Sequence, residues 1–179
     1  MTTSNRPPNN IILCGFMGTG KTTVGQYLAA TLRWPFVDTD RLIEQRQGKS
    51  ISAIFAENGE PFFRQIESAL CEEMIAWRRT VIATGGGIVL KAENRDALNR
   101  AGVVVCLEAP AHEIVERLVG KTDRPLLMGS NPEARVNELL AVRASAYAAL
   151  PHHIDTAGRS SKKVARSVLV LWKHIQRAR

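Results

Sequence analysis

The chain has 179 residues, of which 45% are hydrophobic and 23% charged, and these are ordinary values for a globular protein. No apolar run approaches the about 20 residues that a membrane-spanning helix needs, so we expect no membrane partner. The formal net charge of +7 is compatible with a nucleic-acid partner or with a pocket for small anions. Aromatic residues are only 6% and no nucleic-acid recognition module is recognisable, so we expect small anionic ligands and no nucleic acid.

The ends and the cysteines set the expected organisation and compartment. Residues 1–9 are polar and proline-rich, and we expect a flexible segment there, followed by a single domain over 10–179. The three cysteines have no metal-type spacing, so they are predicted to be buried thiols in a reducing, cytoplasmic compartment. No long apolar edge indicates an obligate interface, and we expect a monomer.

Short apolar runs alternate with longer segments of helical periodicity along the chain. The runs predicted to be strands are 11–14, 35–38, 80–84, 103–108 and 152–156. The predicted helices are 21–32, 40–47, 51–57, 60–77, 93–99, 111–119, 132–150 and 161–177. Near-continuous apolar strands separated by helices are typical of a parallel sheet with helices on both faces, which is a three-layer α/β/α sandwich.

One segment fits neither a strand nor a helix. Residues 120–131, GKTDRPLLMGSN, contain two glycines, a proline and several charged residues between two predicted helices. This composition is typical of a loop. We predict a mobile lid there.

Residues 15–22, GFMGTGKT, match the phosphate-loop pattern G-x-x-x-x-G-K-[ST], with a predicted strand before it and a predicted helix after it. Glycines allow backbone N–H groups to surround phosphates, and the helix adds its positive end. Lys21 is predicted to contact the β- and γ-phosphates of ATP, and the Thr22 hydroxyl to bind Mg²⁺. The ATP-binding residues predicted from the loop are Gly18, Thr19, Gly20, Lys21, Thr22 and Thr23.

Asp38 and Asp40 follow directly after the second predicted strand. Acidic groups at the carboxyl edge of a parallel sheet face the crevice in which ligands bind. Residues two apart in an extended segment point the same way, so both carboxylates are expected to face that crevice. One would help to hold the hydration shell of the metal, and the other would meet an acceptor hydroxyl. The alternative for Asp40 is that it caps the following helix.

Arginines and glycines further along indicate a second site. Arg64 and Glu67 lie three residues apart on one predicted helix, where the carboxylate would fix the direction of the guanidinium. Gly85–Gly87 follows the third predicted strand and would expose backbone N–H groups at the same edge of the sheet. Arg143 and Tyr147 lie one helical turn apart. The alternative for Arg64 and Glu67 is a surface pair worth only about 0.3–0.5 kcal/mol.

The segments DTD, FRQIE, TGGG, DRPLL and RASAY follow the phosphate loop in an order and spacing that closely resemble the shikimate kinase family. The resemblance extends from about Asn10 to the last predicted helix. It implies a P-loop NTPase fold of the nucleoside-monophosphate-kinase type, with a five-stranded parallel sheet and a mobile lid. It also implies ATP-dependent phosphorylation of the 3-hydroxyl of shikimate, on the route to chorismate and the aromatic amino acids. The implied substrates are ATP and shikimate, and the implied cofactor is Mg²⁺.

The resemblance also implies roles on the acceptor side. Asp40 would hold the acceptor hydroxyl and act as its base. Arg64 and Arg143 would clamp the shikimate carboxylate, which suits the planar, two-pronged guanidinium. Gly86 and Gly87 would bind the substrate through their backbone.

On the nucleotide side, Lys21 and Arg124 are the implied catalytic cations. Arg124 in the lid would close over the transferring phosphoryl group and would also bind ATP. Arg117 matches the position that stacks on adenine, although an ordinary charged pair with Glu116 is the alternative. Asp38 matches the position that supports Mg²⁺ through water, beside the direct ligand Thr22.

Two other functions fit the phosphate loop. A gluconate-type kinase also joins such a loop to a pocket for a sugar acid, but it lacks the combined FRQIE and TGGG segments. A non-catalytic nucleotide-binding regulator would use the same fold without phosphoryl transfer. A dependence of ADP release on shikimate separates the leading prediction from both.

Overall fold

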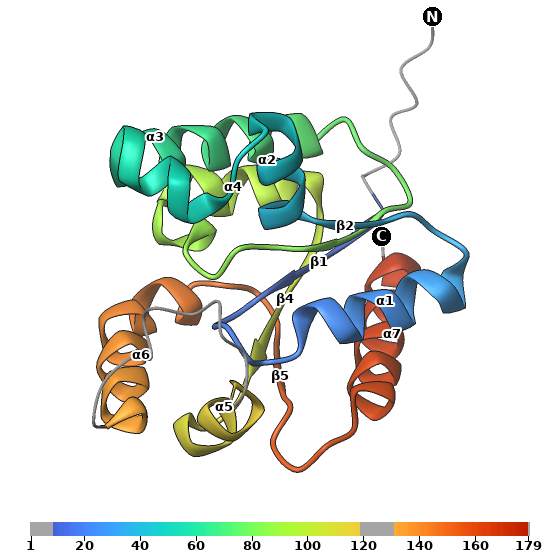
Figure 1. The fold of residues 1–179 in the computed structure, drawn as a ribbon. Helices are drawn as coiled ribbons and strands as arrows, with labels where there is room; N and C mark the ends of the chain where they lie inside the picture. Colours follow the sequence, from blue (N-terminus) through green and yellow to red (C-terminus); the bar gives the residue numbers. More distant parts are fainter. Residues whose placement is uncertain (1–8, 119–130, 179) are drawn as a thin grey trace, which may run out of the picture.

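The computed structural model describes residues 9–118 and 131–178, and a five-stranded sheet runs through the middle of this part of the chain (Figure 1). Its strands are β1 (Asn10–Cys14), β2 (Phe36–Asp38), β3 (Val81–Ala83), β4 (Gly102–Glu108) and β5 (His153–Asp155). All neighbours pair in parallel, in the order β2-β3-β1-β4-β5. The five predicted strands are confirmed, with ends that differ by at most one residue.

Helices follow the strands and cover the sheet. They are α1 (Lys21–Leu32), α2 (Thr39–Gln47), α3 (Ile51–Met74), α4 (Ala92–Ala101), α5 (Ala111–Leu118), α6 (Pro132–Ala148) and α7 (Ser161–Ala178). A short 3₁₀ helix, η1 (Ile88–Leu90), was not predicted, because three residues carry no periodic signal.

The predicted helices over 51–57 and 60–77 correspond to the two arms of α3, which a break separates as predicted, although the second arm ends at Met74. The backbone is non-helical only at Gly59, where φ is 78° and ψ is 167°. Pro61 then falls in the first turn of the second arm, where its missing N–H breaks no hydrogen bond. The result is a kink rather than a loop.

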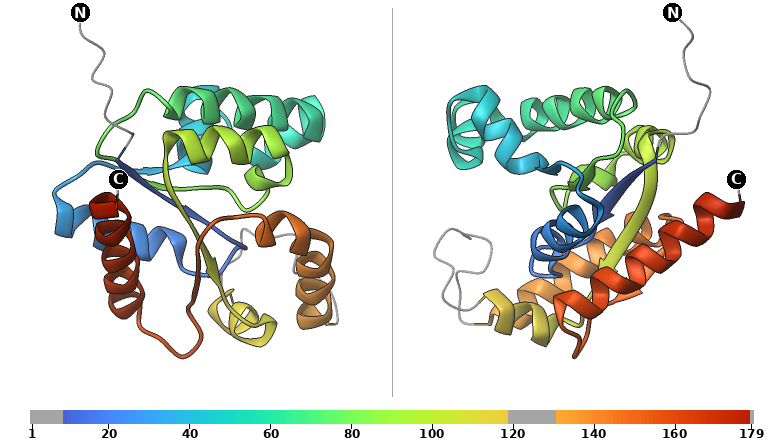
Figure 2. Two further views of the ribbon diagram at one scale, coloured as in Figure 1. Left: turned by 180° about the vertical axis from the view of Figure 1, so that it is seen from behind. Right: turned by 90° about the vertical axis from the view of Figure 1, so that its right-hand side faces the viewer.

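Side chains of each strand alternate between two cores. In β1, Ile11 and Leu13 pack with residues of α1 and α7, whereas Ile12 and Cys14 pack with residues of α3 and α4 on the other face. All four side chains are fully buried. The two views in Figure 2 place α1 and α7 on one side of the sheet and α3 and α4 on the other. The predicted three-layer sandwich is confirmed.

Other predictions have mixed outcomes. The three cysteines are free and buried, as expected. Within the described ranges, no helix is long and apolar enough to cross a membrane. Residues 1–8 of the flexible segment, and 119–130 with most of the lid, lie outside the described residues.

A buried asparagine ties the amino ends of three strands together. The Asn10 amide donates hydrogen bonds to the carbonyl oxygens of Trp77 and Ala101, at 2.8 Å each, and its oxygen accepts one from the Thr80 N–H at 3.0 Å. Asn10 is fully buried, so water does not compete with its side chain for these three backbone groups. The side chain therefore joins β1 to the segments that lead into β3 and β4.

We predict that Asn10→Ala lowers the free energy of unfolding by about 2–4 kcal/mol, because it strands three buried backbone groups. Asn9→Ala is the matched control, since Asn9 Oδ1 accepts a single, exposed hydrogen bond from the Arg79 N–H. The control should lose less than about 1 kcal/mol. Urea denaturation of both variants makes the comparison, and equal losses would contradict the argument.

Candidate active site

The phosphate loop joins β1 to α1 in the predicted way. Gly15 has φ 128°, and a Cβ there would collide with the carbonyl oxygen of Leu107, so only glycine fits. The Lys21 ammonium lies inside the loop and donates to the carbonyl oxygens of Gly15 and Phe16 at 2.8 Å each. Gly20 precedes α1 and has no side chain with which to cap its N-terminus. The loop thus presents a cation and uncapped helix N–H groups, which is the equipment of an anion site.

The threonines of the loop differ in what they offer. Thr19 is buried, and its hydroxyl and its backbone N–H both donate to the Phe16 carbonyl oxygen, at 2.8 and 3.4 Å. The Thr22 hydroxyl donates to Asp38 Oδ2 at 2.9 Å. Thr23 is exposed in the first turn of α1. The hydroxyl and the carboxylate predicted to serve one metal ion are therefore in contact.

The expectation that Asp38 and Asp40 align in an extended segment is wrong. Asp38 ends β2, but Asp40 lies in the first turn of α2. Asp38 Oδ1 accepts from the Asp40 N–H at 3.2 Å, so the residue that caps the helix is Asp38 and not Asp40. This leaves the Asp40 side chain to point elsewhere, toward the segment that follows β3.

The three glycines after β3 bring the charged groups together. A Cβ on Gly85 would lie 2.5 Å from Asp40 Oδ1 and 3.2 Å from Glu67 Oε1. The Gly85 N–H donates to the hydroxyl of Thr39, the residue before Asp40, at 2.9 Å. A Cβ on Gly87 would collide with the guanidinium of Arg64. Bare backbone is thus the surface on which these side chains meet.

Arg64 is held between two carboxylates of its own helix. It donates to Glu67 Oε2 at 2.6 Å and to Glu60 Oε1 at 2.7 and 3.0 Å. The Glu67 side chain is only 1% exposed, so the pair is not a surface pair. Burial alone lowers the pKa of Arg64, but the hydrogen bonds to Glu67 and Glu60 outweigh this and raise it, so the guanidinium stays charged.

The surroundings of Glu67 shift its pKa in opposite directions. Burial raises its pKa against the opposing effect of Arg64, and the charge on Asp40 raises it further. The negative charges of Asp40 and Glu67 therefore interact across Gly85. The ion pair with Arg64 compensates the charge of Glu67.

Arg143 reaches the same glycines from α6. Its Cζ lies 5.5 Å from the centre of the Phe16 ring in the phosphate loop, and its Nη1 would lie 3.7 Å from a Cβ on Gly86. Tyr147, one turn further, donates its hydroxyl to the Gly86 carbonyl oxygen at 2.9 Å. Burial raises the pKa of Tyr147 to about 12, which keeps the phenol protonated as a donor. α6 is thus fixed to the glycine segment and to the phosphate loop.

Arg117 of α5 lies on the other side of the phosphate loop. It donates to the Gly18 carbonyl oxygen at 3.5 Å, to Thr156 Oγ1 at 2.9 Å and to the Thr156 carbonyl oxygen at 3.0 Å. Its ion pair is with Glu113, one turn away, and not with the Glu116 of the alternative interpretation. The guanidinium is therefore fixed between the loop and the segment after β5. Arg124 lies outside the described residues.

The predicted site residues that converge at the carboxyl edge of β1, β2 and β3 are Lys21, Thr22, Asp38, Asp40, Arg64, Gly86, Gly87 and Arg143. Sequence reasoning missed three supports of this site. Glu60 lies four residues before Arg64 and its spacing signals the contact. Thr39 and Thr156 have no such signal, since they bind groups 46 and 39 residues away.

A parallel sheet with this loop, and with charged groups gathered beside it, defines a P-loop kinase fold. Residues 17–172 match the family model described as shikimate kinase. The shikimate kinase of Thermodesulfovibrio yellowstonii is 46% identical over 160 residues, which are 89% of this chain and 92% of that protein. The structure of the Acinetobacter baumannii shikimate kinase in complex with shikimate has a TM-score of 0.86 and 37% identity, over 93% of this chain and 94% of that one. This chain belongs to the shikimate kinase family.

The gluconate-type alternative receives less support. A gluconokinase from Sinorhizobium meliloti has a TM-score of 0.62 at 18% identity, over 97% of both chains. Similarity at that level reflects the common fold alone. It carries no evidence of a shared substrate.

We predict that Gly87→Ala raises the KM for shikimate by about tenfold or more, because the new methyl group displaces the Arg64 guanidinium. The test is a double-mutant cycle with Arg64→Ala. In the Arg64→Ala background the methyl group has nothing to collide with, so Gly87→Ala should add less than about a twofold change. Losses that simply multiply would contradict the steric explanation.

Proposed function

We propose that this chain is a shikimate kinase, which transfers the γ-phosphoryl group of ATP to the 3-hydroxyl of shikimate. The observation that carries the proposal is the convergence of Asp40, Arg64 and Arg143 on Gly85–Gly87, directly beside the phosphate loop. The two arginines suit a carboxylate on the substrate. The Asp40 carboxylate suits a substrate alcohol that must lose a proton. Shikimate offers both groups on one ring.

We propose that Arg64 and Arg143 bind the substrate carboxylate from two helices. Arg64 is oriented by Glu60 and Glu67, and Arg143 by the Phe16 ring. Fixed guanidinium planes lose little freedom on binding and can present paired N–H groups to two oxygens. The backbone of Gly86 and Gly87 would complete the pocket, since bare backbone permits a close approach.

Asp40 is proposed as the base. As the acceptor oxygen forms its bond to the γ-phosphorus, the bond from that phosphorus to the ADP oxygen breaks, and the hydroxyl proton passes to the Asp40 carboxylate. The Asp40 side chain faces the Gly85 backbone beside the phosphate loop, where the acceptor hydroxyl would lie. Lys21 would stabilise the charge that accumulates on the phosphate oxygens.

Mg²⁺ is proposed as the cofactor, and the donor groups present are suited to it. Thr22 Oγ1 and Asp38 Oδ2 lie 2.9 Å apart beside the phosphate loop, and hard cations of this kind prefer oxygen ligands. Thr22 would be a direct ligand, and Asp38 would act through water. When bound, the ion would neutralise part of the phosphate charge.

Arg117 is the residue proposed for the adenine side of the site. Arg117 is fixed at the phosphate loop by Gly18 and Thr156, which supports the proposal that it covers the adenine ring. Closure of Arg124 over the transferring group stays a prediction. A cytoplasmic location is proposed from the three free, buried cysteines, which suit a reducing compartment. The monomeric state also stays a prediction.

We expect ADP release to require both shikimate and Mg²⁺. A coupled ADP assay with and without shikimate measures this directly, and hydrolysis without the acceptor should be at least about 100-fold slower, because water is not held where the acceptor hydroxyl is. Gluconate in place of shikimate is the matched control for the other sugar-acid kinase. Equal ADP release with and without shikimate would refute the proposal, and turnover with gluconate alone would replace it.

Asp40→Asn should lower kcat by about 100-fold or more while ATP affinity changes by less than about twofold, because the amide keeps the shape but accepts no proton. Asp96→Asn, at an exposed position of α4, is the matched control and should retain normal turnover. Steady-state kinetics and nucleotide titration supply the two readouts. Unchanged kcat in Asp40→Asn would remove the aspartate from the mechanism.

A further inference from the structure

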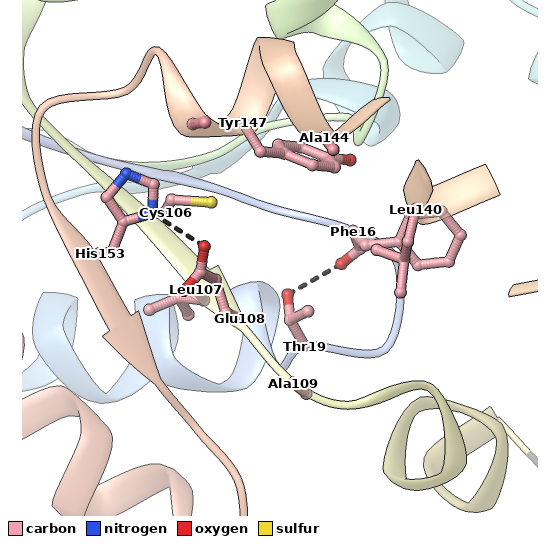
Figure 3. Close-up of a pocket in the computed structure, with 11 residues that line it drawn as sticks. Phe16, Thr19, Cys106, Leu107, Glu108, Ala109, Leu140, Ala144, Tyr147 and His153 are labelled. Atoms are coloured by element: carbon pink, nitrogen blue, oxygen red, sulfur yellow. Dashed lines mark hydrogen bonds and ion pairs between the residues drawn. The ribbon is translucent and has the colours of Figure 1, made fainter. Parts of the chain in front are cut away.

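A cavity of about 460 Å³ lies behind the phosphate loop, apart from the acceptor site (Figure 3). Its walls come from Phe16 and Thr19 of the loop, from β4 and β5, and from α6. None of Asp40, Arg64 and Arg143 lines it. Of the residues that the structure describes, Thr19 is the one predicted ATP-binding residue in its lining, and the proposed binding of the acceptor leaves this cavity without a role.

Three different metal-binding side chains gather on one wall of the cavity. One donor atom from each of Cys106, Glu108 and His153 lies within 4.8 Å of the others. Figure 3 shows the Cys106 sulfur beside the His153 ring, with the Glu108 carboxylate facing that ring. Among the described residues, no other group of three or more His, Cys, Asp or Glu side chains has this arrangement.

The sheet itself fixes these three side chains. Cys106 and Glu108 are two residues apart in β4, so both point to the same face. Cys106 pairs in register with His153 of β5, which places the imidazole beside the thiol on that face. Two paired strands are a rigid support, and rigid supports give metal sites defined geometry.

Each ring nitrogen of His153 lies against one oxygen atom. Its Nε2 lies 2.9 Å from the Leu150 carbonyl oxygen, which can only accept, so Nε2 carries a hydrogen. Its Nδ1 lies 2.8 Å from Glu108 Oε1, also an acceptor when ionised. At 2.8 Å this contact holds a proton, and a bound metal ion would replace that proton once the two groups move apart. A ring N–H bound to a backbone carbonyl is also the usual way in which a metal-binding histidine is oriented.

We propose that Cys106, Glu108 and His153 form a site for one divalent transition-metal ion of the zinc and cobalt class. The ligands would be Cys106 Sγ, a Glu108 oxygen and His153 Nδ1, with the fourth position open to the cavity. Four-coordinate zinc keeps neighbouring ligands roughly 3.3–3.8 Å apart, given its bond lengths. The side chains of Glu108 and His153 are 50% and 33% exposed, so they have room to move to that spacing.

The thiol sets the preference for the metal. Sulfur and imidazole together favour Zn²⁺ and Co²⁺ over Mg²⁺, which takes oxygen ligands. Burial raises the pKa of the Cys106 thiol to about 12, so a bound ion must displace its proton, and a coordinating thiol does lose it. This site is therefore chemically distinct from the oxygen site at Thr22 and Asp38.

The test is titration of the nucleotide-free, chelator-treated protein with Co²⁺ alone. We expect one Co²⁺ per chain and a thiolate-to-cobalt charge-transfer band in the near ultraviolet, which added Zn²⁺ abolishes by displacement. Cys106→Ala should lose the band. His153→Ala and Glu108→Gln should each weaken Co²⁺ binding by about tenfold or more.

His174→Ala, at an exposed position of α7, is the matched histidine control and should bind Co²⁺ normally. Absence of the band in the unmodified chain, or its persistence in Cys106→Ala, would overturn the proposal and leave a simple His153–Glu108 ion pair. Cys106 is buried, so its variant risks misfolding. If that variant misfolds, His153→Ala and Glu108→Gln decide the question, since unchanged Co²⁺ affinity in both also overturns the proposal.

Discussion

The absence of side chains at Gly85–Gly87 is the constraint on which this site depends. Asp40 of α2, Arg64 of α3 and Arg143 of α6 come from three separate helices, and each reaches this short segment of bare backbone. A methyl group at position 85 or 87 would occupy the space of a carboxylate or a guanidinium. The glycines are therefore required by packing, because only the missing Cβ lets charges of both signs approach one peptide segment.

The two arginines of the site have different electrostatic surroundings. Arg64 is paired with two carboxylates, one of them buried, so much of its charge is already compensated and its direction is fixed. For Arg143, no carboxylate of the described residues lies within ion-pair distance, and its neighbours are the Phe16 ring and Tyr147. In the proposed site, a substrate carboxylate would be attracted mainly by the charge of Arg143 and oriented mainly by Arg64.

Much of this arrangement could be predicted from the sequence, because strand periodicity and short motifs are local signals. Each strand and the start of α1 followed from patterns within a few residues. The role of Asp38 could not be predicted in this way. Whether Asp38 or Asp40 caps α2 depends on where β2 ends, and element boundaries are set by tertiary packing. Contacts across long separations, such as Thr39 with Gly85, likewise carry no local pattern.

Phe16 lies between the acceptor site and the cavity. Its buried ring contacts the Arg143 guanidinium on the acceptor side and also lines the cavity that holds Cys106, Glu108 and His153. The phosphate loop thus lies between the phosphoryl-transfer site and the proposed metal site. The chemistry of the two sides differs for a physical reason. The acceptor side is formed by side chains of α2, α3 and α6 around Gly85–Gly87, whereas the cavity side is formed by side chains of the paired strands β4 and β5, where Cys106 and His153 are in register. In the two proposals, one sheet edge would therefore provide oxygen ligands to one ion, and sulfur, nitrogen and oxygen ligands to another.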